Sequence, residues 1–119
     1  MALSVCVLGG TGFIGRSLVA RLAADGHRVK VLTRDRAGAR DLLVLPTVRL
    51  VRADVHDPGV LEREFNGCAV VVNLVGILNE RRPGHGSREF RRVHTELTMK
   101  VVAACRAAGV QRYLHMSGL

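Results

Sequence analysis

Glycines recur at short intervals directly after the first apolar run of the chain, in the stretch Gly9-Gly10-Thr11-Gly12-Phe13-Ile14-Gly15. The spacing fits both G-x-x-G-x-x-G and G-x-G-x-x-G. The first glycine permits a tight turn, Gly12 lets the backbone approach a pyrophosphate, and Gly15 lets a helix lie close to a sheet. The N–H groups and positive end of a helix beginning near Gly12 favour phosphate groups. The stretch therefore predicts that the chain binds a dinucleotide.

The elements on either side of the glycines provide the context that this motif needs. The apolar run at residues 3–8 is typical of a strand buried on both faces, and Ile14, Leu18 and Leu22 recur at helical spacing. A second strand is predicted at Arg28–Thr33. Strand, glycine loop, helix and strand in this order are typical of the dinucleotide-binding fingerprint. The alternative is a glycine-rich turn that packs a helix on a strand and holds no ligand.

The end of the second strand, Thr33-Arg34-Asp35, bears on which dinucleotide binds. NAD binders usually carry a carboxylate there, which holds the ribose 2′-OH. Thr33 takes that place here, and the planar guanidinium of Arg34 can donate two parallel hydrogen bonds to a 2′-phosphate. Asp35 comes one residue late. We therefore favour NADP(H), with NAD(H) as the alternative, and Arg16 either reinforces the phosphate site or is a solvated surface arginine.

Strand and helix signals alternate along the rest of the chain. Further strands are predicted at residues 48–51, 69–75 and 112–116, and helices at residues 36–43, 58–65 and 87–108. Asp57-Pro58 is a good helix start, and Gly109 follows the last helix. Because parallel crossovers are right-handed, this series predicts a Rossmann-type doubly wound α/β sheet with strand order 3-2-1-4-5. The 119 residues suit a single domain, 1–119.

Four stretches of the sequence resemble the extended and atypical short-chain dehydrogenase/reductase superfamily. They are the glycine loop, Ala53-Asp54-Val55, Asn73-Leu74-Val75-Gly76, and the run Tyr113-Leu114-His115-Met116-Ser117. Within the superfamily, residues 72–80 and Arg92-Val93-His94 are most similar to the group related to the NDUFA9-type accessory subunit of respiratory complex I. NmrA-like proteins are the next nearest. The resemblance implies an NAD(P)-binding domain.

The resemblance also implies roles for residues at the ends of the third and fourth strands. Asp54 would accept a hydrogen bond from the adenine amino group, and Val55 would contact the adenine ring. Leu74, Val75 and Gly76 would line the wall beside the two riboses of the cofactor. These residues complete the expected cofactor site.

The family's catalytic pattern is matched only in part by this sequence. Ser117 lies near the family's catalytic serine or threonine, with Gly118 as the alternative register, and His94 stands where many extended members carry a supporting asparagine. The family's Tyr-x-x-x-Lys is absent, since Ser117 stands four residues after Tyr113. We expect a fragment truncated after strand five, without the C-terminal substrate region, that binds cofactor mainly by its adenosine half and does not catalyse. The parent is then an oxidoreductase or epimerase, or a cofactor-bound accessory subunit.

Charge and composition leave several partners open. The formal charge of +8 attracts nucleotide cofactors, nucleic acids or acidic lipids, whereas 3% aromatic residues argue against binding by base stacking. RNA binding stays an alternative, and no DNA partner is expected. The arginine-rich stretch 79–92 is interpreted either as a solvated loop or as a site for an anionic substrate, a membrane phosphate or RNA.

Cysteines, histidines and apolar runs set the last expectations. The three cysteines show no disulfide or metal spacing, so we expect buried free thiols, and the five histidines give no metal site. No apolar run is long enough for a bilayer, and the first residues do not resemble a signal peptide. We expect a cytoplasmic location, or a peripheral one at the inner face of a respiratory membrane in contact with a respiratory-complex partner.

Overall fold

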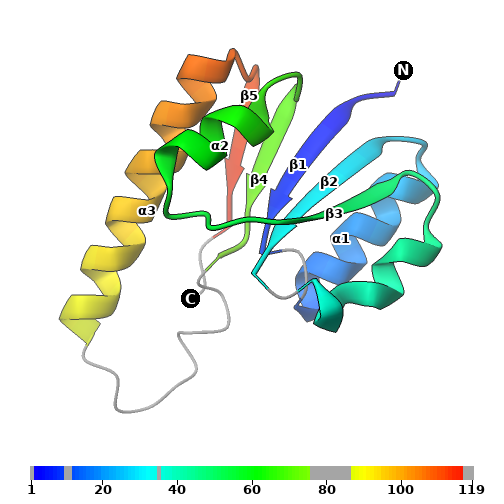
Figure 1. The fold of residues 1–119 in the computed structure, drawn as a ribbon, viewed down its shortest axis with the longest axis horizontal. Coiled ribbons are helices and arrows are strands. Elements are labelled where there is room, and N and C mark those ends of the chain that lie inside the picture. The colour runs from blue at the N-terminus through cyan, green and yellow to red at the C-terminus, as the bar shows by residue number, and fades with distance from the viewer. Residues whose placement is uncertain (1, 10–11, 35, 76–86, 117–119) are drawn as a thin grey trace.

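A parallel sheet of five strands forms the centre of the molecule in the computed structural model, which describes residues 2–9, 12–34, 36–75 and 87–116 (Figure 1). The strands are β1 (Ser4–Leu8), β2 (Arg28–Thr33), β3 (Val48–Arg52), β4 (Val70–Asn73) and β5 (Arg112–His115). Their order across the sheet is β3-β2-β1-β4-β5. The predicted fold class and the predicted strand order are both confirmed.

Strand β1 lies in the middle of the sheet and pairs with a strand on each side. Val5 pairs with Val29 of β2 on one side and with Val70 of β4 on the other. Cys6, Val7 and Leu8 are fully buried. A nearly continuous apolar run suits this position because both faces of a central parallel strand are covered by helices.

In the described part of the chain, two helices cover each face of the sheet. Helices α2 (Pro58–Phe65) and α3 (Ser87–Ala108) pack on one face, and helix α1 (Phe13–Ala24) and the 3₁₀ helix η1 (Ala37–Val44) pack on the other (Figure 1). Alternate residues of β1 point to opposite faces, so Cys6 joins the core under α2 and α3, whereas Val7 joins the core under α1. The crossovers thus leave a separate apolar core on each side of the sheet.

Helix ends agree closely with the sequence signals. The side chain of Asp57 accepts a hydrogen bond from Gly59 N at 2.9 Å, so it caps α2 as predicted. Gly26 and Gly109 follow α1 and α3 with φ angles of +86° and +74°. The helix predicted at 36–43 is a 3₁₀ helix, and no side-chain hydrogen bond caps it at Arg36.

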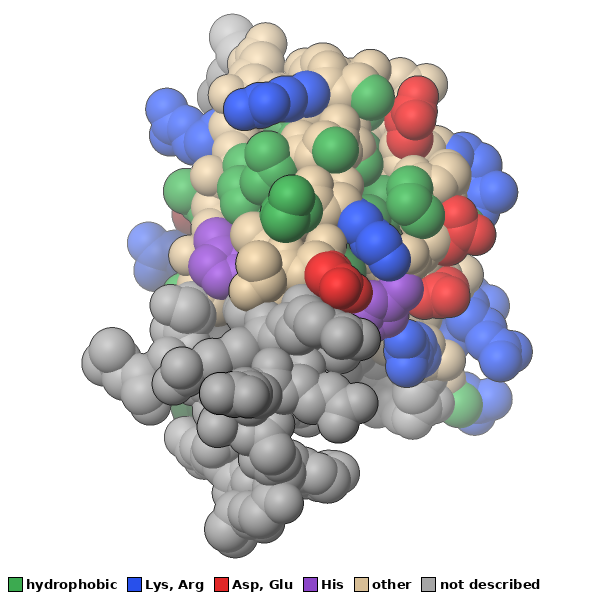
Figure 2. Space-filling model, turned by 90° about the vertical axis from the view of Figure 1, so that its left-hand side faces the viewer, with side chains coloured by type: hydrophobic (Ala, Val, Ile, Leu, Met, Phe, Trp, Pro, Cys, Tyr) green, Lys and Arg blue, Asp and Glu red, His purple; other side chains and the backbone are tan. Residues whose placement is uncertain are grey.

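Helix α3 buries one stripe of its surface and exposes another. Leu97, Val101 and Ala104 are buried against the sheet and α2. Seen from the side of α3, apolar side chains lie exposed among lysine and arginine (Figure 2), and Met99 of α3 is 67% exposed. Among the described residues, no helix has the length and apolar character needed to cross a membrane.

Candidate functional site

The carboxyl ends of the strands bring the predicted binding residues to one edge of the sheet. In Figure 1 this edge faces the bottom of the view, and α1 begins beside it. Gly9 follows β1, Arg34 follows β2, Asp54 lies just beyond β3, and Leu74 follows β4. The chain crosses from one side of β1 to the other between β3 and β4, and ligands of open α/β sheets bind at such a switch point.

Gly9 occupies a position that no other residue type fits. Its φ angle is +76°, which L side chains rarely adopt, and a Cβ atom there would lie 3.1 Å from Val75 N and 3.2 Å from the carbonyl carbon of Leu74. Gly9 N donates to Leu32 O at 3.4 Å. The turn out of β1 is therefore held between the ends of β2 and β4.

The first turn of α1 presents backbone N–H groups at this edge. Gly12 precedes the helix in an extended conformation, with φ −79° and ψ −179°, and it supplies no side-chain cap. The first helical hydrogen bond runs from Arg16 N to Gly12 O at 2.9 Å, so the N–H groups of residues 13–15 are not used inside the helix. Its first turn contains no acidic residue, which leaves the positive end of the helix dipole available to an anion.

The residues of this first turn differ in burial, with a glycine in the core and apolar side chains at the surface. Gly15 is buried, which lets α1 lie close to the sheet. Phe13 and Ile14 are 84% and 41% exposed. These two exposed apolar side chains, beside the backbone N–H groups at the start of α1, form a surface that a ligand can cover.

Arg34 and Asp54 face each other across the ends of β2 and β3. The closest atoms, Arg34 Nη2 and Asp54 Oδ1, are 3.7 Å apart, and both side chains are more than half exposed. An ion pair this exposed contributes little to stability, so the Arg34 side chain can turn to a ligand at small cost. With Arg52 and Ala53, the pair lines an open depression of about 470 Å³.

Backbone contacts fix where Asp54 and its neighbours point. Asp54 Oδ1 accepts a hydrogen bond from His56 N at 2.9 Å, and Ala53 N donates to Thr33 O at 3.0 Å. Val55, which was expected to contact the adenine ring, is only 6% exposed and packs in the core under α2 and α3. Thr33 is 8% exposed. The side chains of Arg34 and Asp54 are thus exposed at the surface, while the buried neighbours Thr33 and Val55 hold the backbone in place.

A hydrogen-bonded chain of side chains links β4 and β5 at the same edge. Asn73 is fully buried, its Oδ1 accepts from Val75 N at 3.0 Å, and its Nδ2 donates to the Tyr113 hydroxyl at 3.1 Å. That hydroxyl lies 3.1 Å from His115 Nδ1. Burial raises the pKa of Tyr113 above its ordinary value, so the hydroxyl keeps its proton at neutral pH. Asn73 therefore orients the backbone of Val75, against which Gly9 packs.

Several predicted positions lie outside the described residues. These are Gly10 and Thr11 of the loop, Gly76 after β4, Ser117, and most of the arginine-rich stretch 79–92. The residues that are described form a continuous set along the edge, because Val75 contacts Gly9, Gly9 contacts Leu32, and Thr33 contacts Ala53. Across the described part of the chain, no group of three His, Cys, Asp or Glu side chains could hold a metal ion.

The arrangement fits the phosphate-bearing half of a nicotinamide dinucleotide. A glycine cradle that a Cβ would fill, the backbone N–H groups at a helix start, and an exposed guanidinium at the next strand end suit a pyrophosphate and a ribose phosphate. The sequence motif predicted that Gly9 and Arg34 follow β1 and β2, where the structure places them. The Asn73–Tyr113 contact was missed, because it joins residues 40 positions apart on neighbouring strands.

Comparisons with known proteins agree with this geometry. A family model described as the NAD dependent epimerase/dehydratase family matches residues 5–118. Ceramide reductase of Caulobacter vibrioides is 35% identical over 118 residues, which cover 97% of this chain and 34% of that protein. The chain thus spans about a third of the length of this curated relative.

Solved structures share the fold. WbmG of Bordetella bronchiseptica, in complex with NAD and UDP, aligns with a TM-score of 0.77 at 24% identity, covering 97% of this chain and 37% of that one. NmrA, a negative transcriptional regulator in complex with NADP, aligns with a TM-score of 0.71 at 19% identity, covering 96% and 33%. The fold, the glycine cradle and the family match together establish that the chain belongs to the NAD dependent epimerase/dehydratase family, as a dinucleotide-binding, oxidoreductase-like domain.

Proposed function

We propose that the chain binds NADP(H), mainly by the adenosine half, and supplies the cofactor-binding part of a reductase- or epimerase-like protein. The observation that carries the proposal is the backbone cradle at Gly9, with the exposed guanidinium of Arg34 at the end of the neighbouring strand. The N–H groups at the start of α1 hold the pyrophosphate, and Asp54 accepts from the adenine amino group. When bound, the nicotinamide supplies or accepts a hydride.

The preference for NADP(H) over NAD(H) rests on the side chains after β2. Arg34 is 69% exposed and its contact with Asp54 is long, so its fork is free to meet a 2′-phosphate with two parallel hydrogen bonds. Arg52 lines the same depression and adds positive charge beside it. The 2′-OH of NAD(H) gains much less from these two cations than a phosphate does.

Titration of the chain with NADPH and NADH tests this preference. Arg34→Ala should weaken NADPH binding by roughly ten- to a hundredfold, the value of a charge-assisted bidentate contact, and NADH binding by less than about threefold. Arg63→Ala is the matched control, since Arg63 is 70% exposed on α2, away from the strand ends. Equal losses for both cofactors would remove the NADP(H) assignment while leaving dinucleotide binding in place.

The parent protein has two candidate roles. One is hydride transfer, supported by the likeness to ceramide reductase. The other is a non-catalytic, cofactor-bound subunit at the inner face of a respiratory membrane, supported by the similarity of residues 72–80 to the NDUFA9-related group. Oxidation of bound NADPH by the full-length protein with a carbonyl substrate favours the first. Cofactor that co-purifies and never turns over, in a protein without a Tyr-x-x-x-Lys beyond residue 119, favours the second.

A further inference from the structure

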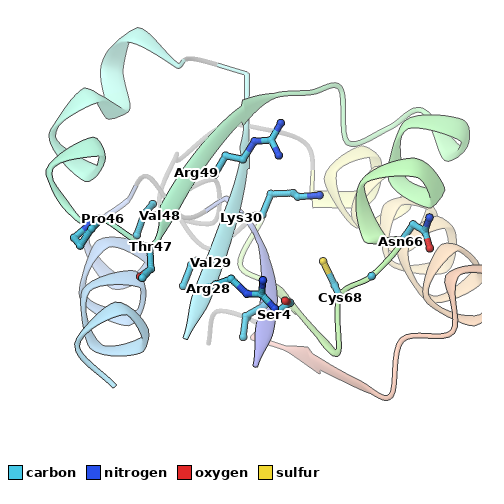
Figure 3. A pocket seen from close by; sticks show the side chains of 12 residues that line it. Ser4, Arg28, Val29, Lys30, Pro46, Thr47, Val48, Arg49, Asn66 and Cys68 are labelled. Carbon is cyan, nitrogen blue, oxygen red and sulfur yellow. The ribbon is translucent and has the colours of Figure 1, made fainter. Parts of the chain in front are cut away.

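A second cavity lies at the opposite, amino-terminal edge of the sheet. Its volume is about 450 Å³, within the range of small-molecule sites. Its lining includes the first residues of three strands, Ser4, Arg28 and Val48, and the segment that leads from α2 into β4 (Figure 3). The proposed cofactor site lies at the carboxyl ends of the strands. Because this cavity lies at their amino ends, it is separate from that site.

Three functional groups from different elements meet on one side of this cavity. Lys30 Nζ lies 3.3 Å from the Glu64 carboxylate and donates to the backbone oxygen of Glu64 at 3.0 Å. As a thiol, Cys68 donates to the same backbone oxygen at 3.6 Å. The sulfur of Cys68 points toward the strands on the side of Lys30 (Figure 3). An ammonium and a thiol thus share one acceptor in a half-buried setting.

Cys68 is distinguished from the other two cysteines by its surroundings. All three cysteines are buried, and Cys6 and Cys105 share the core under α2 and α3 with Cys68, but of the three only Cys68, 8% exposed, lines the cavity. The Cys6 thiol donates a hydrogen bond to the Cys68 sulfur, and together with nearby Lys30 this lowers the pKa of Cys68 to about 7, against the effect of burial. The same contact raises the pKa of Cys6, and burial raises the pKa of Cys105 to about 11.

We propose that Cys68 is a thiol-modification site, at which a small anionic disulfide of the glutathione class enters the cavity and forms a mixed disulfide. The thiol first loses its proton to water. The thiolate then attacks one sulfur of the reagent, so that a bond to Cys68 forms as the S–S bond of the reagent breaks. The departing half leaves as a thiolate and takes a proton from water. The disulfide is itself the oxidant, and no other co-reactant is needed.

Charge around the cavity selects an anionic reagent. Arg28 and Arg49 are exposed and line it, and the Lys30 ammonium lies at its inner side. Glu64 pairs with Lys30 and Arg63, so it balances only part of this positive charge. Carboxylates of the incoming disulfide are therefore attracted to the wall that carries the reactive sulfur.

Incubation with glutathione disulfide under native conditions, followed by intact mass and peptide mapping, tests the proposal. One adduct is expected, on Cys68, lost in Cys68→Ser and retained in the matched control Cys105→Ser. Its rate should rise with pH around about 7, and Cys6→Ala should move that rise to higher pH because a hydrogen-bond donor is removed. Equal labelling of Cys105, or no native adduct, would overturn the proposal.

Two further measurements separate a built site from accidental exposure. Arg49→Glu should slow reaction with glutathione disulfide by at least about threefold and leave reaction with neutral hydroxyethyl disulfide nearly unchanged. The rate should also stay flat in urea concentrations that do not unfold the chain. A rate that climbs with urea in step with unfolding would mean that the thiol reacts only from the opened state, and would refute the site even if Cys68→Ser fails to fold.

Discussion

Gly9 combines two separate reasons for being glycine, and each can be measured. Gly9→Ala places a side chain at a φ of +76° and brings its Cβ to 3.1 Å from Val75 N. We expect a loss of about 3 kcal/mol in the free energy of unfolding, since the positive φ alone costs about 1–2 kcal/mol and the clash adds to it. Urea denaturation measures the loss, and NADPH titration should show that binding is abolished.

Gly26→Ala provides the matched control for that substitution. Gly26 has a φ of +86°, and a Cβ there meets nothing within 4 Å. Its loss should be about 1–2 kcal/mol, from backbone strain only, with NADPH binding intact. If both variants lose the same stability, the close approach to Val75 has no energetic weight and the cradle is less rigid than its geometry implies.

Thr47 carries a buried hydroxyl without a hydrogen-bond partner among the described residues. Thr47→Val keeps the branched shape and removes the unsatisfied group, so the free energy of unfolding should rise by about 1 kcal/mol. Thr47→Ala removes a methyl group as well and should gain less or lose stability, because it leaves a small void. Thermal or urea unfolding of the two variants distinguishes these effects. Lower stability of Thr47→Val would mean that the hydroxyl is satisfied in solution.

How much of the site the sequence predicted depends on the range of the contacts involved. The positions of Gly9 and Arg34 at the strand ends could be predicted because a turn out of a strand and the residue ending the next strand are local features with fixed spacing. The burial of Val55 could not, because packing of α2 and α3 on the sheet decides which way that side chain points. Cys68 was expected only as a buried thiol, since its neighbour Lys30 is brought close by the tertiary fold.

At the scale of elements, strand order was predictable and side-chain links between strands were not. Right-handed crossovers and a run of alternating signals leave few topologies, and 3-2-1-4-5 is the one observed. The link from Asn73 to Tyr113 depends on register, because Val71 is the residue that pairs with Tyr113 and Asn73 lies two residues further along β4. Register depends on how the two strands pair, so neither segment predicts it alone, and β4 ends at Asn73, short of the predicted 75.

The link between β4 and β5 predicts a particular dependence of stability on pH. Burial raises the pKa of Tyr113 in the folded state, so its contribution to stability is fully present below about pH 10 and is lost as pH rises through the folded value. Tyr113→Phe should cost about 1 kcal/mol at neutral pH by leaving Asn73 without this partner. The difference between wild type and variant should shrink at alkaline pH. Urea denaturation at several pH values measures it, and a constant difference would contradict the burial argument.

At the scale of the whole molecule, the two outer strands of the sheet, β3 and β5, differ in how they resist association with another chain. The edge strand β3 exposes Arg49 and Arg52, and charged side chains on an edge discourage pairing with another chain. The other edge strand, β5, exposes Leu114 at 50%, and Met116 just beyond it is 43% exposed. Leu114 pairs with Val72, whose side chain belongs to the core under α1. The apolar face of the sheet therefore continues past the area that helices cover.

This asymmetry predicts that the 119-residue chain associates through β5 rather than through β3. Within the described part of the chain, β5 pairs with a strand on one side only, and an open strand edge beside exposed apolar side chains favours edge-to-edge contact. Leu114→Lys should lower the concentration-dependent rise in sedimentation coefficient that we expect of the wild-type chain. Val44→Lys is the matched control, because Val44 is an apolar residue 81% exposed on η1, beside the β3 edge. Equal effects of the two substitutions would assign association to general surface hydrophobicity. A wild-type chain that stays monomeric at every concentration would show that β5 does not mediate association.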